Sequence, residues 1–197
     1  LTKYLSKNIF EPLGMNDTFF EVPKNKQDRF LPNHTYNRNK NQLETIQNDS
    51  FRITDFDSGG GGLISTAYDY MIFAESLRNG GEFKGKRILG EKTLKYMVKN
   101  HLPPTVRGIG RGESPTDPSV AARTFGLGFG ISNNPPVASV IGSKGSYSWG
   151  GAAGTIFWVD PVEDLVVVSM IQLMRSPWTL RNDLRVATYQ SLTESNE

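Results

Sequence analysis

The segment WGGAAGT at residues 149–155 constrains this chain most, because it lies between apolar runs that favour strands. The runs at residues 156–159 and 165–171 are joined by the sequence DPVED, which predicts an antiparallel hairpin. Glycine has no Cβ, so a ligand can approach the backbone closely at such a turn. Backbone N–H groups presented there can stabilise a developing oxyanion. The segment therefore predicts one part of an acyl-transfer site.

The composition indicates a globular protein. With 197 residues, 37% of them hydrophobic and 21% charged, the chain is long enough for one well-buried domain or two small lobes. The net charge is +2 and the basic residues are scattered, which favours an ordinary solvated surface over a nucleic-acid-binding face. No cysteine is present, so disulfides, a thiolate nucleophile and a zinc ribbon are excluded.

The N-terminal region is expected to be mostly helical. Residues 1–10 have helical spacing, and the helix is predicted to stop at Glu11 because the residue before a proline avoids helical angles. Residues 23–50 are polar and predict a long excursion with short strands. The chain begins inside an expected helix, so we expect a piece of a longer protein. No apolar run approaches the ~18–20 residues of a membrane span, and no signal peptide is visible.

A central helix is predicted after residue 66. Thr66 and Asp69 resemble a capping box, and Gly80 with Gly81 is expected to end the helix. Its core-facing stripe is predicted to comprise Tyr68, Met71, Ile72, Ala74 and Leu77. A second helix is expected at about residues 90–100, followed by a mobile loop at residues 103–123.

The pattern changes to strands at residue 125. Strands are predicted at residues 125–131, 146–151, 155–159 and 165–171, and an amphipathic helix at residues 177–192. Helices followed by an antiparallel meander and a closing helix define the α+β class. We therefore divide the chain into a helix-rich region, residues 1–124, and a strand region with a C-terminal packing helix, residues 125–197.

Three other candidate sites are weak. Residues 80–87 nearly match a phosphate-binding loop, but they lack the Ser or Thr and follow a helix, so a hairpin turn is favoured. The glycines at residues 59–62 lack a preceding parallel strand. His34 and His101 lie apart, without a nucleophile elbow or an acidic cluster, which favours loop or surface roles. No metal or cofactor is predicted.

Four ordered motifs carry a family resemblance. They are IFEPLGMNDT at residues 9–18, GGGGLISTAYDY at 59–70, FGLGF at 125–129, and WGGAAGT with FWVDP at 149–161. Together they resemble the C-terminal half of the serine β-lactamase and penicillin-binding-protein-like family, near its class C, family VIII carboxylesterase and D-aminopeptidase branches. The resemblance implies part of the β-lactamase-like fold, a serine hydrolase acting on an ester, amide or β-lactam, and a periplasmic or secreted location.

The family nucleophile is not found in these residues. By the resemblance, the nucleophilic serine of Ser-x-x-Lys and a Tyr-x-Asn motif precede residue 12. No Ser-x-x-Lys occurs in the chain, and Tyr36, the nearest match to the second motif, is followed two residues later by Arg38 and lies after Met15. We therefore expect the N-terminal half of the family fold to be absent and the chain alone to be inactive. The alternative is a non-catalytic ligand-binding or regulatory module.

The resemblance also assigns the remaining site residues. The family's Lys-Thr-Gly strand is replaced by Trp149, Gly150 and Gly151, and the Ala152 N–H would be one of two oxyanion donors. Losing the lysine removes a cation that would meet a carboxylate, while Trp149 offers an apolar face, unless it simply packs in the core. Gly61 and Gly62 lie where the family's pocket wall often carries a bulkier residue, which predicts an open pocket.

A final expectation concerns partners. In the family sheet the last strand pairs with an N-terminal strand, so the run from Leu165 to Ile171 would here present an unpaired apolar edge. We expect the missing half or a second copy of the chain to pair there, or the chain to rearrange. A stable lone monomer is not expected.

Overall fold

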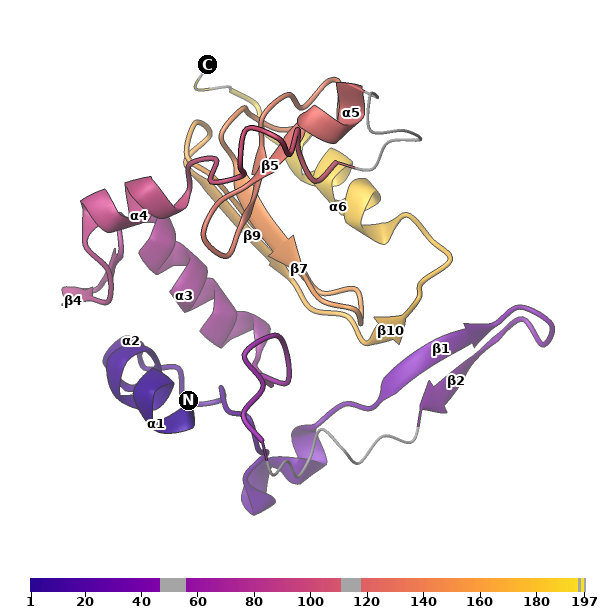
Figure 1. Cartoon of the computed structure of the whole chain (residues 1–197). Coiled ribbons are helices and arrows are strands. Elements are labelled where there is room, and N and C mark those ends of the chain that lie inside the picture. Colours follow the sequence, from indigo (N-terminus) through magenta and orange to yellow (C-terminus); the bar gives the residue numbers. More distant parts are fainter. Residues whose placement is uncertain (47–55, 111–117, 195, 197) are drawn as a thin grey trace.

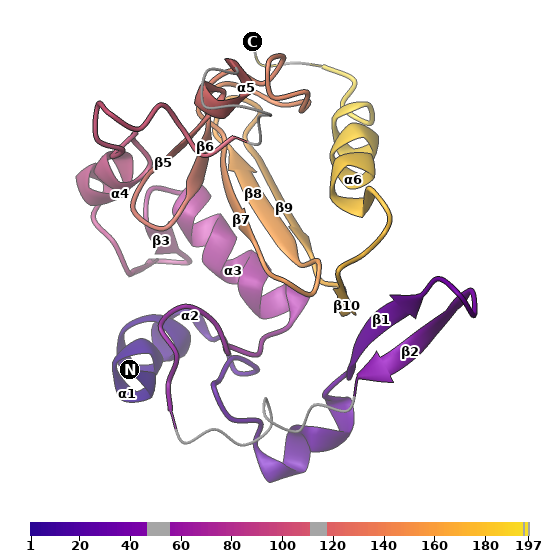
Figure 2. The same ribbon diagram turned by 45° about the vertical axis from the view of Figure 1, so that its right-hand side comes forward.

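A five-stranded antiparallel sheet with a helix on each face forms the centre of the computed structural model (Figures 1 and 2). The structure describes residues 1–46, 56–110, 118–194 and 196. The strands follow the chain in their order across the sheet: β5 (Arg123–Phe125), β6 (Gly130–Ser132), β7 (Tyr147–Gly150), β8 (Ile156–Asp160) and β9 (Leu165–Ser169). The α+β class is confirmed.

Strand β8 forms the middle of the core because both of its faces are covered. Successive side chains of a strand point to opposite faces. Phe157 and Val159 join the cluster that packs against α3 (Ala67–Arg78), and Trp158 stacks on Tyr189 of α6 (Leu180–Tyr189). Trp158 and Val159 have no exposed surface, so β8 fixes the positions of both helices.

The N-terminal helix continues past the predicted stop at Glu11. It runs through α1 (Thr2–Leu5), the π-helical turn η1 (Ser6–Phe10) and α2 (Glu11–Leu13), and Gly14 ends it with φ = 74°. The prediction was wrong because the wider π-helical turn accommodates a proline ring that would clash in a regular α-helix.

The polar excursion after the helix contains the short strands that were predicted. After the 3-10 helix η2 (Lys24–Arg29), β1 (Asn33–Asn37) and β2 (Gln42–Ile46) form a hairpin that extends away from the main sheet (Figure 2). β1 also pairs in parallel with β10 (Leu173–Met174). Residues 47–50 of the predicted excursion lie outside the described residues.

The central helix begins and ends as predicted. The Thr66 hydroxyl accepts a hydrogen bond from the Asp69 N–H at 3.1 Å, and both Gly80 and Gly81 have positive φ angles beyond the last turn. Ile72, Ala74 and Leu77 are buried as expected. Tyr68 is 71% exposed, so its predicted core position is wrong; Tyr70 packs against the core cluster instead.

The predicted hairpin turn at residues 80–87 is confirmed by β3 (Glu82–Phe83) and β4 (Lys86–Arg87). α4 (Glu91–Met97) is shorter than the predicted helix. The loop prediction for residues 103–123 is only partly covered, because residues 111–117 lie outside the described residues, and α5 (Pro118–Ala121) follows them.

The strand predicted at residues 125–131 is two strands. β5 ends at Phe125 and β6 begins at Gly130, and the Gly126 N–H donates to the Phe129 carbonyl at 2.8 Å in the turn between them. Gly128 adopts φ = 92°, a conformation that favours glycine and allows the reversal. The boundary drawn after residue 124 falls within β5; the two-region division itself stays a prediction.

β9 is the outer strand of the main sheet. It pairs with β8 on one side, and no described strand lies on its other side. Its side chains from Leu165 to Ser169 are all half-buried. The strand order therefore agrees with the predicted edge. None of the described helices combines the length and the apolar character that crossing a bilayer requires.

Candidate functional site

The turn between β7 and β8 is closed by its own backbone. The Gly151 N–H donates to the Thr155 carbonyl at 3.0 Å and lies 3.1 Å from the Thr155 hydroxyl. The Gly154 N–H donates to the Gly151 carbonyl at 3.1 Å, and Gly154 adopts φ = 91°. The turn thus has a defined conformation.

Two N–H groups at the tip of this turn remain available. Neither the Ala152 N–H nor the Ala153 N–H has a hydrogen-bond partner among the described residues, and Ala152 is exposed. The Ala153 carbonyl accepts from the Leu173 N–H at 2.9 Å, which joins the turn to the start of β10. Free, preorganised backbone donors are what an oxyanion requires.

Trp149 lies beside the turn and is not a core residue. Its side chain is 48% exposed, whereas Tyr147, two residues earlier on the same strand, is 3% exposed. The Trp149 ring contacts the Phe125 ring edge-to-face, with centroids 5.1 Å apart. The pair forms a partly exposed aromatic surface at the end of β7, the strand that leads into the turn.

The glycines of the segment are required by contacts within the chain. A Cβ at Gly150 would lie 2.8 Å from the Thr155 carbonyl oxygen and 3.1 Å from the Arg181 Cζ atom. A Cβ at Gly151 would lie 2.4 Å from the Thr155 hydroxyl oxygen. We expected a ligand to occupy the space left by the missing Cβ atoms. On these sides of the turn, Thr155 and Arg181 occupy that space instead.

Arg181, near the start of α6, was missed by the sequence analysis. Its guanidinium donates to the carbonyl of Gly151, to that of Thr155 at 3.0 Å and to that of Gly154 at 3.4 Å. A faint signal was available in the sequence, because a basic side chain in the first turn of a helix opposes the helix dipole. Such a residue indicates a compensating contact elsewhere.

Gly61 and Gly62 lie in the segment that leads into α3. The N-terminal end of α3 and the β7–β8 turn lie at the same end of the sheet in both views (Figures 1 and 2). A Cβ at Gly61 would have no atom within 4 Å, and one at Gly62 would meet Phe20 at 3.9 Å. Gly61 is exposed, and its place in a pocket wall stays a prediction.

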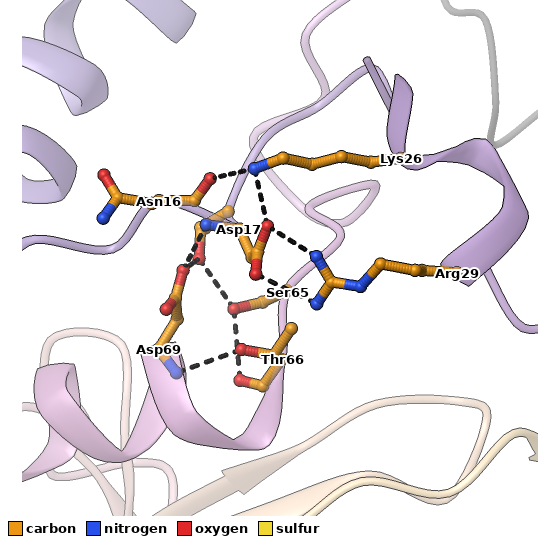
Figure 3. Close-up of polar contacts among 8 residues, drawn as sticks. Asn16, Asp17, Lys26, Arg29, Ser65, Thr66 and Asp69 are labelled. Carbon is orange, nitrogen blue, oxygen red and sulfur yellow. Dashed lines mark hydrogen bonds and ion pairs between the residues drawn. The ribbon is translucent and has the colours of Figure 1, made fainter. Parts of the chain in front are cut away.

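A polar cluster fixes this segment against the N-terminal region (Figure 3). The buried Asp69 carboxylate bonds to the N-terminal region and not to the first residues of α3. It accepts hydrogen bonds from the Asp17 N–H at 2.7 Å and from the Thr18 hydroxyl at 2.9 Å. Hydrogen bonds from Arg29 and then Lys26 lower the pKa of the Asp17 carboxyl. The cluster joins α3 to η2.

The two histidines lie in different parts of the fold: His34 pairs with Leu173 of β10, whose N–H bonds to Ala153 of the β7–β8 turn, whereas His101 lies next to α4. His34 belongs to β1, where its N–H donates to the Gln172 carbonyl at 2.9 Å. The His101 Nε2 atom lies 2.8 Å from the Tyr96 carbonyl, and the two rings are in contact. Within the described part of the chain, no group of three metal-ligating side chains is found.

Solved structures share this architecture. Simvastatin Synthase (LovD) from Aspergillus terreus matches with a TM-score of 0.78 at 24% identity, over 98% of this chain and 51% of that chain. EstCE1, a hydrolase with promiscuous acyltransferase activity, matches with a TM-score of 0.76 at 19% identity, over 95% and 49%. The fold is therefore β-lactamase-like.

The sequence comparison gives the family itself. The Beta-lactamase family model matches residues 1–190, so the chain belongs to the beta-lactamase family. Protein Rv1367c of Mycobacterium tuberculosis is 28% identical over 177 residues, which are 87% of this chain and 43% of that protein. The chain thus spans less than half the length of this relative.

Proposed function

We propose that the chain forms the C-terminal part of a serine hydrolase that cleaves esters or amides through an acyl-enzyme. Ala152 supplies one oxyanion N–H, and residues 149–151 line the acyl pocket together with Gly61 and Gly62. One observation carries the proposal: Ala152 is an exposed residue and its N–H has no partner among the described residues, at the position that the family resemblance assigns to an oxyanion donor.

The covalent step needs groups from outside these 197 residues. A serine of Ser-x-x-Lys attacks the substrate carbonyl, the lysine accepts the serine proton, and the alcohol or amine leaves with a proton as the acyl-enzyme forms. Water then attacks the acyl-enzyme and releases the acid. Since this chain contains no Ser-x-x-Lys, these residues alone are expected to show no turnover.

The exposed Trp149 ring favours one substrate class. An aromatic surface on the strand that leads into the turn would bind an apolar acyl group better than a carboxylate, which would prefer a cation at this position. Neutral esters are therefore the first choice, and amides and β-lactams come after them. No cofactor or metal takes part in the proposed reaction.

The outer strand β9 bears on the partner. No described strand pairs with its outer side, and this side and its half-buried apolar residues support pairing with a strand of the segment that carries the serine, or with a second copy. The second candidate function is a non-catalytic binding or regulatory module, which a full-length protein without Ser-x-x-Lys would favour. The two candidate functions differ in one measurable property: only the hydrolase has a serine that a phosphonate labels.

The test combines labelling, turnover and mass. The 197-residue chain and the natural full-length protein are treated with a fluorescent phosphonate, assayed with p-nitrophenyl butyrate and nitrocefin, and analysed by intact mass and light scattering. We expect labelling and ester turnover only in a species heavier than 21.9 kDa that contains Ser-x-x-Lys. A full-length protein that is neither labelled nor active would favour the binding module. A chain that is monomeric at 21.9 kDa and melts cooperatively would contradict the role of β9.

A further inference from the structure

We infer that Arg181 is a positioning residue that holds the Gly151–Ala152 peptide in the orientation that presents the Ala152 N–H to an oxyanion. The guanidinium reaches from α6 to three carbonyls of the β7–β8 turn, those of Gly151, Gly154 and Thr155. It makes no contact with the exposed N–H side of the turn among the described residues. Arg181 therefore acts through the backbone, and the inference rests on the proposed function only for its effect on catalysis.

The geometry of the peptide unit connects the two groups. The C=O of Gly151 and the N–H of Ala152 belong to one planar trans peptide, in which they point in opposite directions. A cation that fixes the carbonyl on one side of the turn consequently fixes the N–H on the other side. The hydrogen bonds to the Gly151 carbonyl thus also set the direction of the free Ala152 N–H.

The constraint matters because glycine at position 151 limits its own backbone angles less than any other residue would. A Cβ at this position would lie 2.4 Å from the Thr155 hydroxyl oxygen, so a larger residue would require that hydroxyl to move. A flip of the Gly151–Ala152 peptide rotates ψ of Gly151 and φ of Ala152; glycine imposes little steric limit on its own ψ, and a flipped peptide would present a carbonyl to the oxyanion in place of an N–H. The bond from the Gly154 N–H to the Gly151 carbonyl opposes the flip, and Arg181 adds a charge-assisted bond.

The place of Arg181 in its helix supports a dedicated role. Thr179 precedes α6, so Arg181 lies in the first helical turn, where positive charge is unfavourable. Three carbonyl acceptors 26 to 30 residues earlier in the sequence compensate for that position. The planar guanidinium spreads five N–H donors over a rigid fork, whereas the lysine ammonium holds its three donors on one atom, so arginine fits separated carbonyls better.

The test compares three variants of the natural full-length protein. Arg181→Met removes the donors and keeps much of the side-chain volume, and Arg181→Lys keeps the charge. Arg87→Met is the matched control, because Arg87 also bridges two carbonyls, those of Gly80 and Leu89, but at the β3–β4 hairpin. Steady-state kinetics with p-nitrophenyl butyrate and the rate of phosphonate labelling are measured for each.

We expect Arg181→Met to lower kcat by ~10–100-fold, somewhat less than the loss of a whole oxyanion donor, while KM changes by less than about 3-fold. Arg181→Lys should recover part of the loss, and Arg87→Met should stay within about 2-fold of the wild type. A kcat for Arg181→Met within about 3-fold of the wild type would overturn the inference.

A second readout separates this inference from the proposed function. The ¹³C shift of the Gly151 carbonyl and the amide shifts of Ala152 report the orientation of the peptide whether or not the protein has activity. We expect both to change in Arg181→Met and to stay unchanged in Arg87→Met. If the wild type shows no turnover, the proposed function fails and these shifts alone decide; unchanged shifts in Arg181→Met overturn the role of Arg181.

Discussion

The two turns at the ends of β8 satisfy their backbone groups in opposite ways. At the β8–β9 turn, the fully buried Asp160 carboxylate accepts from the N–H groups of Val162, Glu163 and Ser143, and from the Tyr189 hydroxyl. At the β7–β8 turn a cation instead holds the carbonyls, and the N–H groups of Ala152 and Ala153 have no partner among the described residues. A carboxylate consumes donors, whereas a guanidinium leaves them available.

One helix serves both turns. Arg181 and Tyr189 are eight residues apart in α6, a rise of about 12 Å, and the ends of β8 are about 13 Å apart. Between them the Arg185 guanidinium lies over the Trp158 ring, 4.5 Å from its centroid, and burial lowers the pKa of Arg185. The helix is thus matched in length to the strand, and its first turn contacts the candidate site while its last turn contacts a purely structural one.

The largest expected effect is at the structural turn. Asp160→Ala leaves buried N–H donors and a tyrosine hydroxyl without an acceptor, which should lower the free energy of unfolding by ~3–5 kcal/mol. Urea unfolding of the protein measures it. Asp160→Asn keeps one acceptor oxygen and should lose less. A loss below about 1 kcal/mol for Asp160→Ala would show that the Asp160 carboxylate does not hold the β8–β9 turn, and would contradict the contrast between the two turns.

The next prediction tests how tightly the candidate site is packed. Gly154→Ala adds a Cβ 2.5 Å from the Ile171 Cδ1 atom at φ = 91°. Gly128→Ala is the matched control, with φ = 92° and no atom within 4 Å of the added Cβ.

The control should lose ~1–2 kcal/mol of unfolding free energy from backbone strain alone, and Gly154→Ala ~1–3 kcal/mol more from overpacking. Thermal and urea unfolding of both variants give the difference. Equal losses in the two variants would mean that Ile171 moves aside easily and that the turn is less rigid than its contacts indicate.

The sequence was informative where contacts are local or periodic. The apolar runs on both sides of residues 160–164 predicted the β8–β9 hairpin, and Thr66 was identified as a helix cap because its partner is three residues away. The turn at residues 149–155 was found by its glycines. These features follow from rules that act within one element of secondary structure.

The residues that were missed make contacts over long distances in the sequence. Arg181 is 26 to 30 residues from its carbonyl partners, and Asp69 is more than 50 residues from Asp17 and Thr18. The spacing of apolar and polar residues contains no information about such pairs. The capping pattern explained Asp69 by its N–H alone and gave no sign that its carboxylate bonds to Asp17 and Thr18. The reason for Gly150 and Gly151 was likewise visible only when Arg181 and Thr155 were in place.

The smallest expected effect concerns Tyr189, through which α6 contacts the structural turn. Its hydroxyl donates to the Asp160 carboxylate at 2.6 Å, and burial, together with that carboxylate, raises the pKa of Tyr189. Burial also raises the pKa of Tyr70 to about 12 and that of Tyr147. Because these folded-state pKa values exceed the ordinary value of 10.0, the stabilisation is complete below pH 10 and is lost as the pH rises through the folded-state pKa values.

Tyr189→Phe should therefore cost only ~1 kcal/mol near pH 8 and make the alkaline loss of stability less steep by about a third, since two of the three tyrosines remain. Absorbance at 295 nm and urea unfolding between pH 8 and 11.5 measure both effects. Tyr70→Phe is the control, because it removes one late-titrating phenol without touching Asp160. Equal stability of the two variants near pH 8 would show that the Tyr189 hydroxyl contributes nothing through Asp160, and that α6 is held at this end by the stacking on Trp158 alone.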